Sequence, residues 1–379
     1  MNWIAWKMLT GDRAKYFGTV FGVAFGVLLI SQQTSIFVSL MRRTAHAVID
    51  VRDASVWVMD PDQQNADEIK PLTDSDLNRV RGVEGVAWAV RYFKSLARAK
   101  IETGKFRQVV LLGLDDQTLV GAPARMVEGS LANLRRPDAI IVDKAGYEYL
   151  WGKEPIRLGR TLEMNDRRAV LVGICEATAP FQTFPVVYTR YSQAVRFVAG
   201  ERKVMSFVLA QHQTGWTDEQ LAHKIHEKTG LMAQTRPQFI RFVIGYYMRN
   251  TGIPVNFGIT IALGFIVGTA IAGQTFYLFT LENLKQFGAL KAMGVSDLKI
   301  TGMVLLQASI VGIIGYGLGI GMAALFFEST RNVTALAGFY MPWEVAVGAL
   351  CAVAIIIVLA SFLSLRKVLT LEPAVVFRG

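Results

Sequence analysis

Four long apolar segments interrupt an otherwise charged chain. Each lacks Asp, Glu, Lys and Arg over at least the roughly 20 residues that a helix needs to cross the hydrocarbon core of a bilayer. We therefore expect four transmembrane helices, at residues 17–41, 251–281, 300–327 and 345–365. The first segment is close to the start of the chain, but its apolar run is too long for a signal peptide and no small-residue cleavage site follows it. We interpret it as a retained anchor.

The segment between the first two apolar runs, residues 42–250, carries charged residues throughout and must lie outside the bilayer. Strand and helix patterns alternate along this segment, which is typical of an α+β domain. The predicted fold class is therefore a membrane protein, with four transmembrane α-helices and a large extracytoplasmic α+β domain between spans one and two.

Local signals predict individual elements within the α+β segment. Thr73 is in position to cap a helix, and Thr217 with Gln220 forms a capping-box pattern at the start of another. A second lobe is expected to begin near Pro137, because strand-like runs and a short helix follow that residue. The expected strands are 55–59, 96–101, 106–112, 139–142, 169–174 and 186–188.

Basic residues in the short flanks of the spans predict the orientation. They are concentrated before the first span, in the 282–299 loop and in the 366–379 tail, whereas the 328–344 loop has only Arg331. By the positive-inside rule, both termini and the 282–299 loop face the cytoplasm and the α+β domain faces outside. We therefore expect a multi-pass protein of the inner (cytoplasmic) membrane. The basic residues of the three rich flanks are Lys7, Arg13, Lys15, Lys285, Lys291, Lys299, Arg366, Lys367 and Arg378.

Composition agrees with a membrane protein. Of 379 residues, 52% are hydrophobic and 18% are charged, and the mean hydropathy is +0.34, which excludes a disordered chain and disfavours an ordinary soluble enzyme. The net charge is +10, from 40 basic and 30 acidic residues. No basic run with interleaved aromatic residues occurs, so we expect no nucleic-acid partner.

Sequence motifs for catalysis or cofactor binding are absent. The Gly-Lys pairs at 104–105 and 152–153 lack the rest of a phosphate-binding loop, and Cys175 and Cys351 form no metal-binding pattern. His223 and His226 could share a helix face, but no third ligand is near, and a solvated face is the better interpretation. We predict no catalytic, cofactor or metal residues, and therefore no enzyme activity of the chain itself.

The spans contain no ionisable residue, so they lack the groups on which gradient-driven transport usually relies. Small residues instead recur at a spacing of four, which lets helix backbones approach closely within one copy or between copies. A homodimer in the lipid bilayer is plausible, because four spans rarely enclose a pathway. The span-packing candidates are Gly18, Gly22, Gly26, Gly264, Gly268, Gly317 and Gly321.

The 282–299 loop and residues 1–16 both combine apolar and basic positions. In the loop, Leu284, Phe287 and Leu290 recur every three residues beside Lys285 and Lys291, which predicts a helix with an apolar stripe. Residues 1–16 have the composition of a helix that lies in the membrane interface. Both segments are either plain membrane-surface helices or a docking surface for a cytosolic motor.

The loop also carries a family resemblance. The stretch Gly288-Ala-Leu-Lys-Ala-Met-Gly294 resembles the G-x-L-[KR]-A-x-G motif that follows the second span of MacB/FtsX-like permeases, and the order of one span, large external domain and three spans matches that family. Residues 250–294, with Trp57-Val-Met-Asp60, resemble its DevC-like branch. Gln286 departs from the pattern, because many relatives carry an acidic residue at that position.

The resemblance implies a membrane subunit of an ATP-binding-cassette (ABC) exporter that works by mechanotransmission. Two copies would pair with two copies of a separate ATPase, and the external domains would drive a periplasmic adaptor and an outer-membrane channel to export a glycolipid, lipid, drug or peptide. The alternatives are an FtsX-like regulator of a cell-wall hydrolase, whose external domain is usually smaller, and a membrane-embedded enzyme. The implied ATPase-coupling residues are Leu284, Lys285, Phe287, Gly288, Leu290, Lys291, Ala292, Met293 and Gly294.

Overall fold

The computed structural model describes residues 2–68, 70–198, 205–331, 333, 336 and 338–369. The chain forms two compact units. The helical unit comprises Met1–Ser39, Gly252–Arg331 and Phe339–Gly379, and the α+β domain comprises Leu40–Thr251 with a short later segment. Each unit is described separately below.

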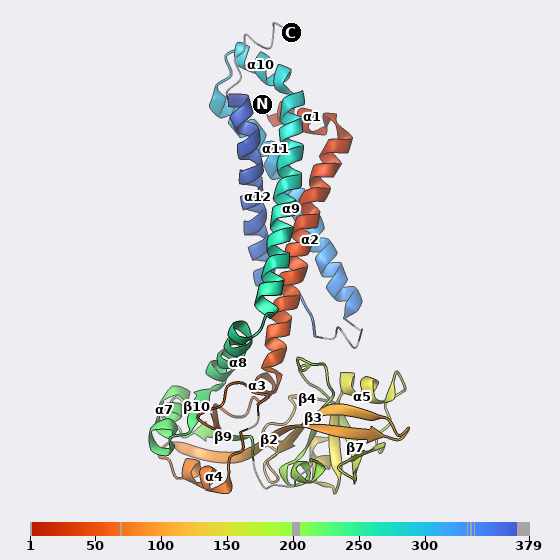
Figure 1. The fold of residues 1–379 in the computed structure, drawn as a ribbon, viewed down its shortest axis with the longest axis vertical. Helices are drawn as coiled ribbons and strands as arrows, with labels where there is room; N and C mark the ends of the chain where they lie inside the picture. The colour runs from red at the N-terminus through yellow and green to blue at the C-terminus, as the bar shows by residue number, and fades with distance from the viewer. Residues whose placement is uncertain are drawn as a thin grey trace. The chain divides into compact units, whose positions relative to one another are not determined.

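The helical unit contains the four helices that are long and apolar enough to cross a membrane, as predicted. In Figure 1, these four helices run side by side, and two shorter helices lie at one end of them. The expected 1–16 helix is in fact two elements, because the chain bends at Asp12 and residues 13–16 already belong to the first span helix. The helices are α1 (Asn2–Gly11), α2 (Arg13–Thr44), α9 (Ile253–Glu282), α10 (Leu284–Ala292), α11 (Asp297–Thr330) and α12 (Trp343–Leu369).

Glycines let the span helices approach each other closely. A Cβ atom on Gly26 of α2 would lie 3.1 Å from the Cα atom of Gly268 in α9, and one on Gly22 would overlap Ile271 of α9. On another side of α2, a Cβ atom on Gly319 of α11 would lie 2.6 Å from the carbonyl oxygen of Ala24. These glycines therefore set the distance between helix axes.

The remaining small-residue candidates behave differently. Gly264 packs against Leu29 of α2, but Gly18, Gly317 and Gly321 have no atom of a neighbouring described element within 4 Å of a Cβ position. Within one copy, α11 packs through Gly315 and Gly319 rather than through the Gly317 face that the spacing suggested. The Gly18, Gly317 and Gly321 positions therefore face open space among the described residues.

The α+β domain is built on one sheet of ten described strands (Figure 1). The strand order is β10-β1-β9-β2-β3-β8-β5-β7-β4, and β6 pairs with both β2 and β7. Pairs β3–β8 and β5–β7 are parallel and the other pairs are antiparallel. The strands are β1 (Val56–Met59), β2 (Val86–Ile101), β3 (Phe106–Leu114), β4 (Arg125–Gly129), β5 (Ala139–Asp143), β6 (Thr161–Met164), β7 (Arg167–Glu176), β8 (Val186–Arg190), β9 (Phe207–His212) and β10 (Met232–Thr235).

Both faces of the sheet are covered, so the side chains on both sides of its central strands are apolar. In β1, Val56 and Val58 join one core, while Trp57 and Met59 join the other. One face carries α4 (Asp74–Arg81), α5 (Lys144–Trp151), α6 (Tyr191–Ala194) with the short helix η2 (Val195–Phe197), and α7 (Asp218–Thr229). The other carries α3 (His46–Asp50), η1 (Leu131–Arg135) and α8 (Arg236–Asn250).

The local predictions for this domain are confirmed. Thr73 and Thr217 each close a capping box at the start of α4 and α7, and the expected strands correspond to β1, β2, β3, β5, β7 and β8. The expected lobe boundary near Pro137 does not interrupt the sheet, because β4, which precedes it, pairs with β7. The long strand β2 pairs with β9 through its first half and with β3 through its second, and so joins the two halves of the sheet.

Candidate functional site

The predicted ATPase-coupling residues, 284–294, lie in α10 and the turn that follows it. Helices α1 and α10 form one end of the helical unit. Helix α10 begins directly after α9, where Asn283 breaks the helix and its side-chain amide donates to the Phe279 carbonyl at 2.8 Å. The turn of residues 293–296 then leads into α11. We call the exposed side chains of α1, α10, this turn and the first turn of α11 the end surface.

The apolar stripe of α10 faces the interior of the helical unit. Phe287 is fully buried and packs with Ile300 and Val304 of α11. Leu290 packs with Met303 of α11 and Ala5 of α1. The expectation that this stripe is free to fill a groove on a partner is therefore wrong for Phe287 and Leu290, because their surface is already covered by the chain's own helices.

Other side chains make up the end surface. Met293 is 72% exposed, Leu298 is 84% exposed and Trp3 of α1 is 70% exposed. Lys285 and Gln286 are also exposed. The sequence pattern does not select Leu298, because it lies outside the three-residue periodicity of 284–290. It is the second residue of α11, and its only signal is an apolar side chain between Asp297 and Lys299.

Gly294 explains why the motif ends in glycine. Its φ angle is +87°, a conformation that glycine adopts without strain. The Gly294 N–H donates to the Lys291 carbonyl and the Val295 N–H to the Leu290 carbonyl, both at 3.0 Å, which is the Schellman pattern of a helix end. Lys291 also pairs with Asp297 at 2.9 Å. The turn that presents Met293 and leads into α11, where Leu298 lies, is therefore held by its own backbone and by an ion pair.

Helix α1 is fastened to the same end of the unit. The buried side chain of Gln307 in α11 donates to the Ala5 carbonyl at 2.8 Å. Lys15 forms ion pairs with Asp12, at 3.0 Å, and with Glu282. Between α1 and the α9–α10 junction lies an open groove of about 400 Å³, whose lining includes Trp3, Lys7, Phe279, Glu282 and Gln286. Gln286, the departure from the family pattern, thus lines a groove that already holds a carboxylate.

The two histidines of α7 differ in their surroundings. His226 makes a hydrogen bond of 2.8 Å with the Leu231 carbonyl, beyond the end of the helix, and His223 is exposed. Within the described ranges, no three His, Cys, Asp or Glu side chains lie close enough together to hold a metal ion. Cys175 is buried and Cys351 is exposed, and both are free thiols.

Comparison with known families decides the class of protein. Residues 16–228 match the MacB-like periplasmic core domain, which is more than half of the chain, and residues 255–373 match the FtsX-like permease C-terminal domain. The chain belongs to the MacB/FtsX family of ABC transporter permeases. The second match begins near the start of α9, where the second span begins.

Individual relatives agree with this family. An uncharacterized ABC transporter permease of Mycobacterium tuberculosis is 25% identical over 314 residues, which cover 82% of this chain and 80% of the relative. One of Methanocaldococcus jannaschii is 22% identical over 235 residues, or 59% and 58% of the two chains. The crystal structure of the periplasmic region of MacB from Actinobacillus actinomycetemcomitans superposes with a TM-score of 0.38 and 13% identity, covering 54% of this chain and 96% of that one.

Membership of the family implies an ATPase partner for this permease. The motif at 288–294 includes both buried and exposed positions. Gly294 shapes the turn, Leu290 packs α10 against α1 and α11, and Met293 is exposed. The motif therefore contains residues that fix the shape of the end surface, Leu290 and Gly294, as well as an exposed residue, Met293.

Proposed function

We propose that this permease is the membrane subunit of an ABC exporter and that ATP is hydrolysed on a separate subunit, which docks on the end surface. The observation that carries the proposal is the exposure of Met293, on a turn whose backbone is fixed by Gly294, and of Leu298, in the first turn of α11 directly after it. Together with Trp3, these strongly exposed apolar side chains belong to one surface that is suited to burial on a partner.

The distribution of charge supports a cytoplasmic position for this surface. Lys7, Lys285 and Lys299 flank it, and the loop between the third and fourth spans has only Arg331. By the positive-inside rule both termini and the end surface face the cytoplasm of the inner membrane, and the α+β domain faces the periplasm.

The spans favour mechanical transmission over ion coupling. No ionisable residue interrupts the apolar segments, so the energy has to come from a partner. Helix α2 is followed in the chain directly by α3 of the α+β domain, and α8 of that domain leads directly into α9. A movement imposed by the ATPase at one end of α2 and α9 is thus conducted along two continuous connections.

The assembly that we propose is a homodimer with two ATPase subunits. Gly18, Gly317 and Gly321 have open space beside them in one copy and are the positions that a second copy can approach. A periplasmic adaptor and an outer-membrane channel would complete the export path for a glycolipid, lipid, drug or peptide, as the DevC-like resemblance suggests.

Co-purification tests this function. The full chain is extracted in a mild detergent and its partners are identified by mass spectrometry, with ATP turnover measured before and after the partners are removed. The proposal expects an ABC ATPase and an adaptor, and no saturable turnover from the isolated permease. Recovery of a cell-wall hydrolase in place of the adaptor would favour an FtsX-like regulator, and turnover by the isolated chain would contradict the division of labour.

A further inference from the structure

The α+β domain contains a cavity of about 140 Å³ that the proposed function does not use. It lies beside β2 and β3 and is closed by α3, α8 and the segment 180–184 that precedes β8. One wall is apolar and consists of Leu96, Val110, Pro180, Phe181 and Phe184. The other wall is polar and consists of His46, Asp67, Lys94, Ser95, Gln182 and Tyr247.

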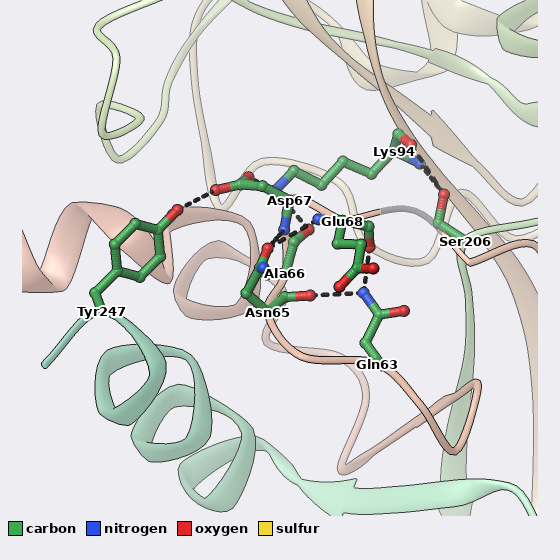
Figure 2. Close-up of polar contacts among 8 residues, drawn as sticks. All are labelled: Gln63, Asn65, Ala66, Asp67, Glu68, Lys94, Ser206 and Tyr247. Carbon is green, nitrogen blue, oxygen red and sulfur yellow. Dashed lines mark hydrogen bonds and ion pairs between the residues drawn. The ribbon is translucent and has the colours of Figure 1, made fainter. Parts of the chain in front are cut away.

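The polar wall is organised by the buried side chain of Lys94. Its ammonium group donates to the Ala66 carbonyl at 2.9 Å and to one carboxylate oxygen of Asp67 at 2.5 Å. The hydroxyl of Tyr247, from α8, donates to the other carboxylate oxygen at 2.9 Å (Figure 2). Burial opposes ionisation of Asp67, but the Lys94 charge and the hydrogen bonds from Lys94 and Tyr247 outweigh it and lower the pKa of this carboxyl. The carboxylate and the ammonium therefore compensate each other.

The loop that supplies Asp67 is itself rigid. The Asn65 side-chain oxygen accepts from the backbone N–H groups of Asp67 and Glu68, both at 2.8 Å. The Gln63 amide donates to the Asn65 carbonyl at 2.6 Å, and Figure 2 shows these contacts around one turn of the chain. The carboxylate is thus held in place before any ligand arrives.

His46 is the member of the polar wall with bonding capacity to spare. It is 3% exposed, and its Nδ1 atom has no hydrogen-bond partner among the described residues. Burial lowers the pKa of His46 to about 3, with a smaller contribution from Lys94. The ring is therefore neutral near pH 7 and offers one donor and one acceptor. Buried polar atoms are normally paired, so a partner group here would be stabilising.

The apolar wall is also preformed. The ring of Phe181 lies 5.5 Å from that of Tyr247, measured between centroids. The segment that carries Phe181 is fixed to α3, because Asp50 accepts from the backbone N–H and the hydroxyl of Thr178, at 2.8 and 2.5 Å. A pocket with one aromatic wall and a few placed polar groups has the usual form of a small-molecule site.

Size and charge define the chemistry of the ligand. A cavity of about 150 Å³ is known to accept a benzene ring, so this one is large enough for one ring. An ion would lose its hydration without finding an uncompensated charge, because Lys94 and Asp67 are already paired. We propose that the cavity binds a neutral ring compound that carries a hydroxyl group, with the ring against Phe181 and Phe184 and the hydroxyl paired with His46.

This proposal goes beyond the proposed function and does not depend on it. The cavity is lined by α3, the first helix after α2, and by α8, the last helix before α9. A ligand here would contact both segments that connect the domain to its spans. Binding itself requires no ATPase, so its failure would leave the docking proposal untouched.

Fluorine NMR of 4-fluorophenol tests the site on the full chain in nanodiscs, with empty nanodiscs as the blank. We expect saturable binding of 4-fluorophenol, and binding of 4-fluorotoluene and of 4-fluorobenzoate about tenfold weaker or more, because the first cannot pair with His46 and the second brings an uncompensated charge.

Two variants with matched controls locate the binding. His46→Phe should weaken 4-fluorophenol about tenfold, whereas His223→Phe, at an exposed position of α7, should leave it unchanged. Leu96→Trp fills the mouth from a half-exposed position without altering the polar wall, and should abolish binding, whereas Leu158→Trp should not. Equal affinity for 4-fluorotoluene, tighter binding of 4-fluorobenzoate, absence of saturable binding, or unchanged affinity in Leu96→Trp would each overturn the proposal.

Discussion

The α+β domain and the helical unit of this permease are held together by opposite uses of side-chain size. In the domain, large side chains fill two cores, and Trp57 lies within 5.4 Å of the rings of Tyr92, Phe207 and Phe239, measured between centroids. In the helical unit, the closest contacts are made where a side chain is missing, as at Gly26 and Gly319. The outer surface of the unit remains apolar, because lipid exerts no hydrophobic force that would bury it. In the α+β domain the hydrophobic effect decides which side chains are buried. In the helical unit the close approach of helix backbones decides which residues lie at the contacts.

The largest effect is expected from removing a large side chain from the domain. Trp57→Ala should lower the free energy of unfolding by about 3–5 kcal/mol, because it leaves a cavity in the core between the sheet and the helices α3 and α8. Urea titration of the full chain in detergent, followed by near-ultraviolet circular dichroism, measures this loss. Trp3→Ala is the matched control, and a loss of similar size there would show that burial is not what distinguishes the two tryptophans.

In the helical unit the reverse substitution is the damaging one. Gly319→Val should cost about 1–3 kcal/mol, because the added atoms meet the Ala24 carbonyl and Val27 of α2. Gly317→Val, two residues away and facing open space, should leave the thermal midpoint of the monomer unchanged. If the two valine variants melt at the same temperature, close backbone approach within one copy is not what stabilises this unit. A loss of dimer only in Gly317→Val would sharpen the assignment of that face to a second copy.

The α+β domain and the helical unit also differ in how much of their structure the sequence predicts. In the domain, Thr73 and Thr217 were recognised as caps because a hydroxyl bonding to the third backbone N–H is a local interaction. The four spans were found because charge is excluded from lipid. The sequence does not predict which face of a span packs inward, since both faces are apolar. The spacing of four points to Gly317 and Gly321, whereas Gly315 and Gly319 make the contacts with α2.

The same limit affected the candidate site. The three-residue periodicity of Leu284, Phe287 and Leu290 correctly predicted a helix with an apolar stripe. The periodicity cannot distinguish a stripe that packs on α1 and α11 from one that packs on a partner protein, because burial of apolar area is stabilising in both cases. The periodicity of α10 does not extend to Leu298, which follows the 293–296 turn and lies in the first turn of α11.

A moderate effect on association is expected at Leu298, in the first turn of α11. Leu298→Ala should weaken binding of the ATPase by about 1 kcal/mol, roughly fivefold, with no change in the melting temperature of the permease. Phe287→Ala should instead lower the melting temperature, because Phe287 lies in the interior. Affinity is measured by titrating the purified ATPase onto the permease in nanodiscs. Unchanged affinity in Leu298→Ala would remove this part of the end surface from the interface.

The smallest effect is expected from charge at the rim. Lys285→Ala should reduce affinity by about 0.2–1 kcal/mol, and the reduction should shrink as salt is raised, because an exposed charge is screened. Titrations at low and high ionic strength measure both quantities. A salt-independent loss larger than that of Leu298→Ala would place Lys285 in a desolvated contact and reverse the order of importance.

Site-specific photo-crosslinking tests the docking of the ATPase most directly. A benzophenone amino acid replaces Leu298 in the full chain in membranes, and Leu325 of α11, also strongly exposed but within a span, serves as the matched control. We expect a crosslink from position 298 to a protein with the nucleotide-binding motifs of an ABC ATPase, and none from position 325. An ATPase that co-purifies with the permease but crosslinks only from position 325, or from neither position, would contradict docking at the end surface.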